Sequence, residues 1–541
     1  MKNRFVSGIP RRRMATAVAL AAASLAAGQA MAFQIPTAEG SDVEIRWDNT
    51  VKYNVGMRTK GRDASIYNTW LHNGSDGKFD KGDLVTNRVD LLSELDFVVK
   101  KNYGFRLSGA AWYDAAYNDK FEGNPALAAL AALPSPYAGN RYTDTVKRYY
   151  TKSGELLDAF VFGRVDIADV PVNVKFGRHT IYWGESLFSP IHGVSYSQGP
   201  VDFRKALATP GSEAKELFLP LSQLSAQAQI NDTVSVAAQY YLEWAPYRLP
   251  EGGTYLSSAD PFFAGGTNVF GTPYLGDRSG HNPGNRGSWG VNTKLTPEWL
   301  QATVGLYYRH FDDKVPTILA NPAGYMYNAY AQDVRLWGVS VSKQISGIAF
   351  GAELVRRDNG ALNTLGGSSE IARGSTWHGL VNALAYVGKT AVFDSATLMA
   401  ELSYSRLAHV DEGSKALFSG DKYGACSGVK SGCSTDSAYG ISATFTPTWF
   451  QALPSVDITM PIHYDIGLKG NSPVPFGGNE NSGTWSIGVG AEYMAKYKFD
   501  LAYTNYFGNY LRAADGTVSA FNGNAAISDR SWLSFTFKTT F

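Results

Sequence analysis

Cysteine, basic charge and long apolar runs are all scarce in this chain of 541 residues. With only two cysteines, Cys426 and Cys433, disulfides do not form the framework of the fold. The formal net charge of +1 excludes the strong basic excess of a nucleic-acid-binding protein, so we expect no nucleic-acid partner. Beyond residue 32, no stretch approaches the ~20 uncharged apolar residues of a membrane-spanning helix.

Local catalytic motifs are also missing. The chain has no G-x-S-x-G, H-E-x-x-H or P-loop sequence. None of its eight histidines, which include His179, His192, His310 and His463, stands beside a nucleophile or at the spacing of a metal pair. We therefore predict neither enzymatic activity nor a cofactor; a catalytic triad assembled in space from distant residues is the open alternative.

The amino terminus has the pattern of a secretory signal. Basic residues at 2, 4 and 11–13 precede the apolar stretch "MATAVALAAASLAA", and "AMA" follows at 30–32. We predict a cleaved signal peptide over residues 1–32, and twin-arginine export is the alternative interpretation. Removing these five basic residues from the 49 leaves 44 against 48 acidic residues, a net charge of −4.

Gly, Tyr and Phe are plentiful, with 56, 31 and 28 copies, and long segments alternate with a period of two. Residues 42–58, "DVEIRWDNTVKYNVGMR", place apolar side chains on one face and charges of both signs on the other. At 17 residues this run is well above the usual ~5–6 residues of a strand. The carboxy-terminal "SWLSFTFKTTF" alternates too, with Leu533, Phe535, Phe537, Thr539 and Phe541 on one face.

Alternating runs occur in pairs joined by short connections, for example at 100–103, 168–171 and "TPTWFQALP" at 446–454. Much longer segments separate the pairs: 59–84, 118–155, 184–221, 247–286, 313–333, 358–375, 408–436, 468–482 and 510–528. Short turns at one end and long loops at the other are typical of outer-membrane β-barrels, in which closure pairs every backbone amide. We predict an all-β transmembrane antiparallel barrel over residues 33–541, with about 18 strands (range 14–18) and both termini periplasmic. A soluble sandwich or solenoid is the alternative.

The carboxy-terminal strand carries the features expected of a barrel-assembly signal. Its outward aromatic residues Phe535, Phe537 and Phe541 end the chain on an aromatic side chain. We predict that barrel-assembly machinery and outer-membrane lipid are partners of this chain. The two cysteines stand seven positions apart in a Gly/Ser loop, so in an oxidising compartment we expect a local Cys426–Cys433 disulfide; two free thiols are the alternative.

Residues 184–221 depart from the pattern of an ordinary loop. They contain four prolines and a set of charges that includes Glu185, Asp202, Arg204, Glu213 and Lys215. We predict that this segment folds into the lumen as a constriction or plug; a compact external loop is the alternative. We expect further lumenal charges at Arg46, Lys52, Arg88, Glu94 and Arg106, either as a mixed-sign pore lining or as salt-bridge ladders.

Weaker signals lie in the predicted loops. Asp76, Asp80 and Asp83 stand among glycines and are candidate calcium ligands, although their spacing is not that of an EF-hand and solvated turn residues are the alternative. Residues 124–133, "NPALAALAAL", predict a short helix that either lines an entry route or packs under neighbouring loops. The repeated Thr-Pro-x-Trp at 296–299 and 446–449 suits tryptophan anchoring at the membrane interface.

The motifs "FGRHTIYWGESLF", "PVDFRKA" and "PGSEAKELFLPLSQL", together with "DGKFDKGDLVTNRVDLLSELDF" at 76–97, resemble the 1302 family of domains of unknown function from Gram-negative outer membranes. The resemblance extends from Phe33 to Phe541. One position departs from the pattern, because His179 stands where an amide side chain is expected. The resemblance implies an outer-membrane barrel, a periplasmic or lipoprotein partner and an inner-membrane transporter of the resistance-nodulation-division type.

These features favour a passive conduit for hydrophobic or amphipathic molecules across the outer membrane. Two other functions are compatible with the same residues: a structural or adhesive surface barrel without flux, and a general porin for small hydrophilic solutes. The sequence gives neither the transported molecule nor the direction of transport.

Overall fold

The computed structural model describes residues 33–35, 38, 40–69, 72–117, 120–125, 137–260, 268–269, 272–276, 282–322, 326–424, 426, 428–514, 516 and 518–541. The predicted signal peptide over residues 1–32 lies outside these residues, as do residues 126–133 of the predicted short helix. None of the helices in the described part of the chain has the length and hydropathy needed to span a membrane.

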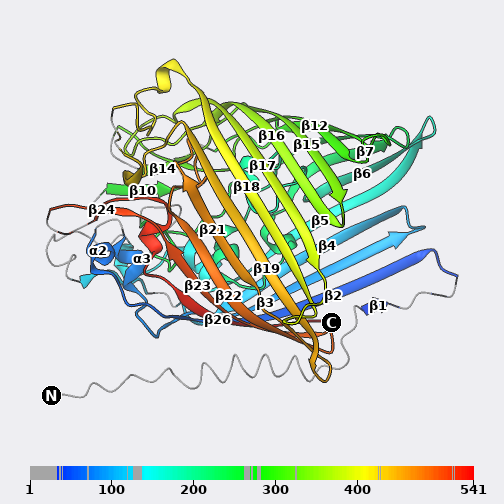
Figure 1. Cartoon of the computed structure of the whole chain (residues 1–541), viewed down its shortest axis with the longest axis horizontal. Coiled ribbons are helices and arrows are strands. Elements are labelled where there is room, and N and C mark those ends of the chain that lie inside the picture. The colour runs from blue at the N-terminus through cyan, green and yellow to red at the C-terminus, as the bar shows by residue number, and fades with distance from the viewer. Residues whose placement is uncertain are drawn as a thin grey trace.

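An antiparallel sheet closes on itself to form a barrel with 18 strands in its wall, which confirms the predicted fold class (Figure 1). The short strand β1 (Phe33–Ile35) pairs with β2 outside this count, and β20 and β21 are two parts of one wall strand interrupted at residues 460–461. The wall consists of β2 (Val43–Arg58), β3 (Leu84–Val99), β4 (Tyr103–Asp114), β5 (Lys152–Ile167), β6 (Val170–His179), β7 (Leu221–Gln229), β8 (Val234–Tyr241), β11 (Trp289–Leu295), β12 (Thr303–Phe311), β15 (Val334–Ile345), β16 (Ile348–Ala361), β17 (Arg373–Val387), β18 (Ser395–Val410), β19 (Ser437–Leu453), β20 (Val456–Thr459), β21 (Ile462–Lys469), β22 (Gly483–Tyr493), β23 (Tyr497–Phe507) and β26 (Trp532–Thr540).

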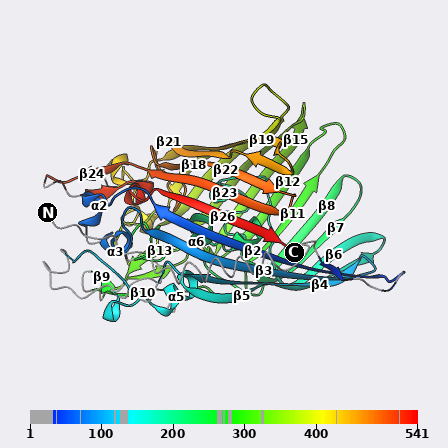
Figure 2. The ribbon, with the colours of Figure 1, turned by 90° about the horizontal axis from the view of Figure 1, so that it is seen from below.

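The first and last long strands close the barrel. Strand β26 pairs with β2 from Thr50↔Thr540 to Arg58↔Trp532, and the two lie side by side in Figure 2. The backbone of Phe541 adds two hydrogen bonds to Asn49, of 2.7 and 2.8 Å. Closure leaves neither of these two strands with a free edge, as a β-sheet in lipid requires.

Alternation along the strands separates the two faces of the wall. In β15, Leu336 and Ser340 point inward and are buried, whereas Trp337, Val339 and Val341 point outward and are exposed. Exposed apolar side chains on every second residue are unfavourable in water but match the hydrocarbon layer of a membrane. The alternation in the sequence therefore corresponds to an apolar outer face and a buried, largely polar inner face of the wall.

The two ends of the barrel differ as predicted. Connections at one end are short, such as the two-residue turn of Ala168 and Asp169, both with positive φ (48° and 66°) as in a type I′ hairpin. Long loops gather at the other end with α2 (Ala64–Tyr67), α3 (Asn73–Gly77) and the short paired strand β24 (Tyr510–Arg512), as Figure 1 shows. The predicted alternation of short turns and long loops is confirmed along the described chain.

Some predicted loops are wrong in detail. "TPTWFQALP" is not a turn, because residues 446–453 continue β19 and pair with β18 and β20, and the reversal occurs at residues 454–455. Several predicted long loops contain short strands that pair with one another beyond the wall. These strands are β9 (Asn268–Val269), β10 (Thr272–Gly276), β13 (Thr317–Ala320), β14 (Met326–Ala329), β24 and β25 (Val518–Phe521).

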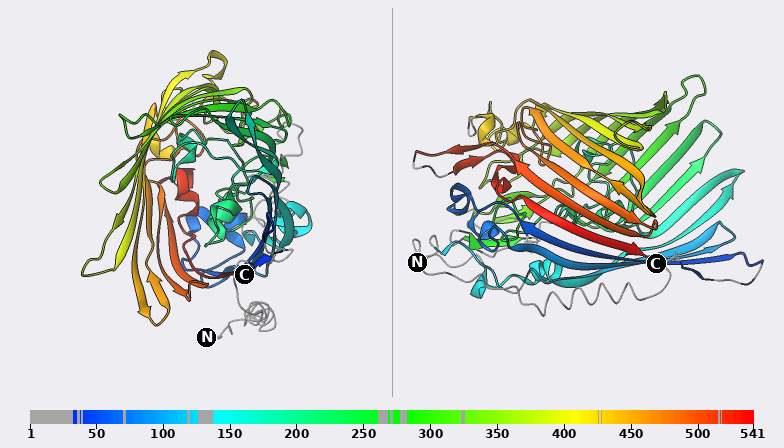
Figure 3. Two further views of the ribbon diagram at one scale, coloured as in Figure 1. Left: turned by 90° about the vertical axis from the view of Figure 1, so that its right-hand side faces the viewer. Right: turned by 60° about the horizontal axis from the view of Figure 1, so that its bottom comes forward.

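Residues 184–221, here called the lumenal segment, lie inside the ring of strands, where Figure 3 shows them in the view along the barrel. Their buried side chains Ile191, Val194 and Tyr196 pack with Leu336 and Val355 of the wall in one hydrophobic core. The remaining helical elements are η1 (Ala138–Asn140), α5 (Asp144–Tyr150), η2 (Pro190–His192), α6 (Phe203–Ala208), α7 (Ala214–Leu217), η4 (Glu412–Ser414), η5 (Val429–Ser431) and η6 (Gly523–Ile527).

Candidate functional site

Glu353, on the inner face of β16, holds the start of the lumenal segment. Its carboxylate accepts hydrogen bonds from the backbone N–H groups of Glu185, Ser186 (3.0 Å) and Val194 (2.6 Å). Gly184 has φ +98°, and a Cβ there would lie 2.5 Å from the Glu353 carboxylate, so only glycine fits. Three charge-assisted bonds to a buried carboxylate fix this part of the segment against the wall.

Glu401, on β18, repeats the arrangement one step further along the segment. Its carboxylate accepts from the backbone N–H groups of Leu187 (2.7 Å), Phe188 (3.2 Å) and Ser189 (2.7 Å). Asn382 on β17 donates both to Glu401 (3.2 Å) and to the carbonyl oxygen of residue 185 (2.6 Å). Glu401 is 1% exposed, and removing it would leave three partly buried backbone donors without this acceptor.

Two buried histidines connect the same part of the segment to β17. The Nδ1 atoms of His192 and His378 lie 3.0 Å apart, and His192 Nε2 lies 2.9 Å from the carbonyl oxygen of Gly477. Arg357 of β16 contacts the His378 ring, and its guanidinium lies 3.9 Å from the centre of the Tyr196 ring. Burial and the nearby Arg357 lower the pKa of His192 to about 4, so its docked imidazole is neutral at neutral pH.

Acidification should therefore weaken the docking of the lumenal segment. Released His192 would take up a proton near its ordinary pKa of 6.5, whereas docked His192 stays neutral down to about 4. The stabilisation is complete above about pH 6.5 and falls by up to about 1.4 kcal/mol per pH unit across this window. We expect channel openings in planar bilayers to become more frequent as pH falls through it. His192→Gln should flatten this dependence, and an unchanged pH profile would contradict the prediction.

The second half of the segment is fixed by ion pairs to the opposite wall. Glu216 of α7 contacts Lys52 of β2 at 3.2 Å, and both side chains are buried. Glu213 at the start of α7 pairs with Lys538 of β26. Glu213 and Glu216 also form the capping box of α7, so the same carboxylates order the helix and attach it to the wall.

A ladder of charges continues from α7 down the wall. Glu94 of β3 contacts both Lys215 of α7 and Arg106 of β4. Arg106 also pairs with Asp96 (3.0 Å) and Asp158 (3.4 Å) on the neighbouring strands. These residues are engaged with one another, which favours the salt-bridge-ladder interpretation over a freely hydrated pore lining.

The remaining predicted lumenal charges have different surroundings. Arg46 is largely exposed near the turn end and pairs with Asp48 at 2.8 Å, away from the segment. Arg88 forms a buried, bidentate salt bridge with Asp90. Asp202 caps α6 and contacts Arg204 and Arg248, while the Glu185 side chain lies 3.4 Å from Ser340 Oγ.

Glu353 and Glu401 are the attachments that sequence reasoning missed. Each lies at an inward position of its strand, within the same tripeptide Ala-Glu-Leu at 352–354 and 400–402. This repeated tripeptide with an inward glutamate was the available signal. His179 is the position that departs from the family pattern. Its ring contacts Ser225 Oγ (2.8 Å) and the carbonyl oxygen of residue 177 (3.0 Å), both on neighbouring parts of the wall.

The candidate calcium ligands do not converge. Asp76 is fully buried and pairs with Arg58 at 2.5 Å and with Arg530 at 3.6 Å, so it is neither a calcium ligand here nor the solvated turn residue of the alternative interpretation. Asp80 and Asp83 lie at an exposed turn, where Asp83 accepts from the backbone N–H of residue 80. In the described residues, no group of three or more His, Cys, Asp or Glu side chains is placed to hold a metal ion.

The predicted disulfide and carboxy-terminal strand have clear positions. Cys426 and Cys433 are bonded, with their Cα atoms 5.7 Å apart, in the loop between β18 and β19. Phe535 and Phe537 lie on the outward face of β26, and Phe541 follows its last residue. Recognition of this strand by assembly machinery stays a prediction.

A cavity of about 790 Å³ lies between the lumenal segment and the wall formed by β18 to β22. The segment contributes mainly apolar side chains, including Leu187, which is 42% exposed, and Phe188, whose ring centre lies 5.8 Å from that of His463. The wall contributes polar groups such as Ser442 and Asp465 and apolar ones such as Ile441 and Ile466. The cavity is therefore lined mainly by apolar side chains, with a smaller number of polar groups on the wall, at a volume typical of binding sites for small organic molecules.

The wall is closed, its outer face is apolar, and its interior is lined by charged side chains and filled by the lumenal segment. These features define a transmembrane β-barrel. The chain matches the family described as "Protein of unknown function (DUF1302)" over residues 13–541, and it belongs to that family. None of the curated protein sequences matches it.

Solved structures of porin and Occ proteins are similar to the chain at low identity, and three of them serve as examples. OccAB2 from Acinetobacter baumannii is 8% identical with a TM-score of 0.43, covering 92% of this chain and 98% of that one. A BenF-like porin from Pseudomonas fluorescens Pf-5 is 11% identical with a TM-score of 0.42 and the same coverage. Pseudomonas aeruginosa OccK2 (OpdF), solved in complex with glucuronate, is 10% identical with a TM-score of 0.40, covering 92% and 97%. This similarity is too distant to transfer a function.

Proposed function

We propose that this chain is a non-enzymatic outer-membrane channel for amphipathic molecules, whose aperture is controlled by the lumenal segment. The cavity of about 790 Å³ supports this proposal, because a mainly apolar lining with a few polar groups complements an amphipathic molecule. The long loops are external, the short turns and both termini are periplasmic, and the signal peptide directs export. A periplasmic or lipoprotein partner and a resistance-nodulation-division transporter would provide directed transport.

Uptake into vesicles that contain the purified barrel tests this function. We expect taurocholate, an amphipathic anion that crosses lipid poorly, to enter faster than glucose. Phe188→Ser should slow taurocholate uptake by about tenfold, since it removes an apolar contact from the cavity surface without changing the wall. Val392→Ser, in a short turn far from the cavity, is the matched control and should leave uptake unchanged.

The other two functions predict different results. A general porin would admit glucose at least as fast as taurocholate, and Phe188→Ser would not slow the amphipathic solute. A structural or adhesive barrel would admit neither solute in vesicles where the protein is folded. Either result would overturn the proposed function.

A further inference from the structure

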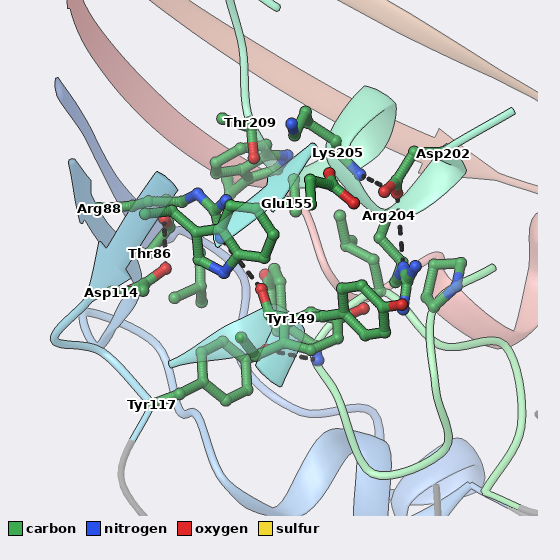
Figure 4. A pocket seen from close by; sticks show the side chains of 18 residues that line it. Thr86, Arg88, Asp114, Tyr117, Tyr149, Glu155, Asp202, Arg204, Lys205 and Thr209 are labelled. Atoms are coloured by element: carbon green, nitrogen blue, oxygen red, sulfur yellow. Dashed lines mark hydrogen bonds and ion pairs between the residues drawn. The ribbon is translucent and has the colours of Figure 1, made fainter. Parts of the chain in front are cut away.

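A second, smaller cavity lies on the opposite side of α6 from the apolar one. Phe203 and Leu207 of this helix line the large cavity, whereas Arg204 and Lys205 line the small one, which has a volume of about 40 Å³ (Figure 4). That volume holds on the order of three water molecules or one small polar group, but not an aromatic ring. Helix α6 therefore separates an apolar compartment of the lumen from a charged one.

Lys205 provides an unpartnered charge in this small cavity. Its side chain is only 6% exposed, and among the described residues Nζ has neither a hydrogen bond nor an ion pair. The nearest aromatic contact is the face of Trp112, whose ring centre lies 5.6 Å from Nζ. A buried ammonium without a directly bonded anion is unfavourable, so Nζ has an unfilled position for a hydrogen-bond acceptor.

The acidic residues in and near the cavity are bonded to other groups. Asp202, which lines the cavity, contacts Arg204 and Arg248. Asp114 accepts from the hydroxyl of Thr86 and from the backbone N–H groups of residues 87 and 116. Behind the lining, Asp90 pairs with Arg88 and Glu216 pairs with Lys52. None of these carboxylates is bonded to Lys205 Nζ, which interacts with Asp90 and Asp202 only beyond ion-pair distance.

Arg204 adds a second free donor. Its Nη1 contacts Glu251 at 2.6 Å and its Nε lies 3.4 Å from Asp202, but Nη2 is buried without a partner. Glu155 lines the same cavity; it pairs with Arg248 through one oxygen at 2.7 Å and keeps the other without a partner. The cavity thus presents two free cationic donors and one free carboxylate oxygen.

We propose that Lys205 Nζ binds the carboxylate group of an organic acid that enters the lumen. The inference rests on the proposed channel function and specifies the polar group of its solute. A ligand carboxylate would form a charge-assisted hydrogen bond with this ammonium, which the described residues do not otherwise satisfy. Glu155 opposes the negative charge and limits the affinity, so that the solute is bound weakly enough to leave again.

Titration of the detergent-solubilised mature protein with hexanoate and with 1-hexanol tests the site. The two probes share a chain length and differ in the carboxylate. We expect hexanoate to bind the protein more tightly than hexanol does. Lys205→Gln should weaken hexanoate binding by about tenfold or more and leave hexanol binding unchanged. Glu155→Gln should strengthen hexanoate binding, because it removes a like charge from the cavity.

Two controls separate binding from folding. Lys215→Gln removes a lysine that is paired with Glu94 elsewhere in the lumen, and it should not alter hexanoate binding. Without ligand, Lys205→Met should be at least as resistant to urea as the parent protein, because an unpaired buried charge is removed. A clear loss of stability would assign Lys205 a structural role and overturn the proposal.

Equal binding of hexanoate to the parent protein and to Lys205→Gln would also overturn it, as would the absence of hexanoate binding. These results are independent of transport, since binding is measured on solubilised protein. If binding behaves as expected but vesicles show no uptake, the channel function fails and the carboxylate site remains.

Discussion

Replacing residues 181–219 with a short Gly-Ser linker should convert a nearly closed barrel into one with a large, steady ionic conductance. We expect the single-channel conductance in planar bilayers to rise by about tenfold or more, because an empty barrel of this strand number encloses an aqueous channel. The replaced residues carry the backbone groups held by Glu353 and Glu401 and the whole of α6 and α7.

The barrel itself should tolerate this replacement. His179 and Leu221 are paired neighbours in the ladder between β6 and β7, so a short linker can join the two strands without changing their register. Strand β6 would keep all eight of its pairs with β7. Heat-dependent migration on gels and circular dichroism provide the check that the shortened barrel has folded.

A double variant tests the same mechanism without shortening the chain. Glu353→Ala with Glu401→Ala removes the acceptors of six backbone N–H groups of the lumenal segment. We expect flickering conductance between the closed and the fully open levels, since the contacts of α7 with Lys52 and Lys538 remain. If the linker variant conducts no better than the parent barrel, the lumenal segment does not limit passage.

Asp76→Leu should destabilise the loop end of the barrel by about 3–5 kcal/mol, because it breaks a buried ion pair from one side. Asp76, Arg58 and Arg530 have no solvent exposure. Burial alone would raise the pKa of Asp76, but Arg530 and Arg58 hold it below its ordinary value, so the carboxylate is charged at neutral pH. Without it, both guanidinium groups share Asp529, their remaining carboxylate partner among the described ion pairs.

Three loops meet at this cluster, and their integrity provides the measurement. Arg58 also donates to the carbonyl oxygen of residue 79, and Arg530 donates to the carbonyl oxygens of residues 255 and 257. We expect Asp76→Leu to expose these loops to trypsin and to lower the urea midpoint. Asp80→Leu is the matched control, since Asp80 is 58% exposed and its ion pair with Arg62 is long at 3.6 Å. This substitution should lower the free energy of unfolding by about 0.5 kcal/mol or less. Equal effects of the two variants would show that the buried cluster does not hold the loops.

The strands could be predicted from the sequence because lipid imposes a simple pattern on them. In β2, the predicted inward residues Lys52 and Arg58 are buried in the lumen, and the predicted outward Trp47 and Met57 are exposed. In β26, Ser534 and Thr536 point inward and Leu533 outward, as the alternation requires. The prediction of a turn at "TPTWFQALP" is wrong because Pro447 does not end the strand: it pairs with Ala396 within the ladder between β18 and β19.

The lumenal contacts could be predicted only in part. Proline and charge density marked residues 184–221 as unusual, but they did not show which wall residues the segment meets. Glu353 and Glu401 are 159 and 214 positions from Val194 and Leu187 in the chain, and only closure of the barrel brings them together. Asp76 was misjudged for the same reason, because its partner Arg530 lies at the far end of the sequence.

The sequence by itself determined that this chain is an antiparallel membrane barrel of about 18 strands with unequal ends, because period-two alternation and turn spacing are local properties that the lipid environment makes strict. The tertiary structure decided what fills the barrel. It alone placed backbone donors of the lumenal segment on two wall glutamates, left Lys205 without a bonded anion, and separated a mainly apolar cavity from a charged one across α6. Such contacts join residues far apart in the chain, and their pairing depends on the closed geometry of the wall.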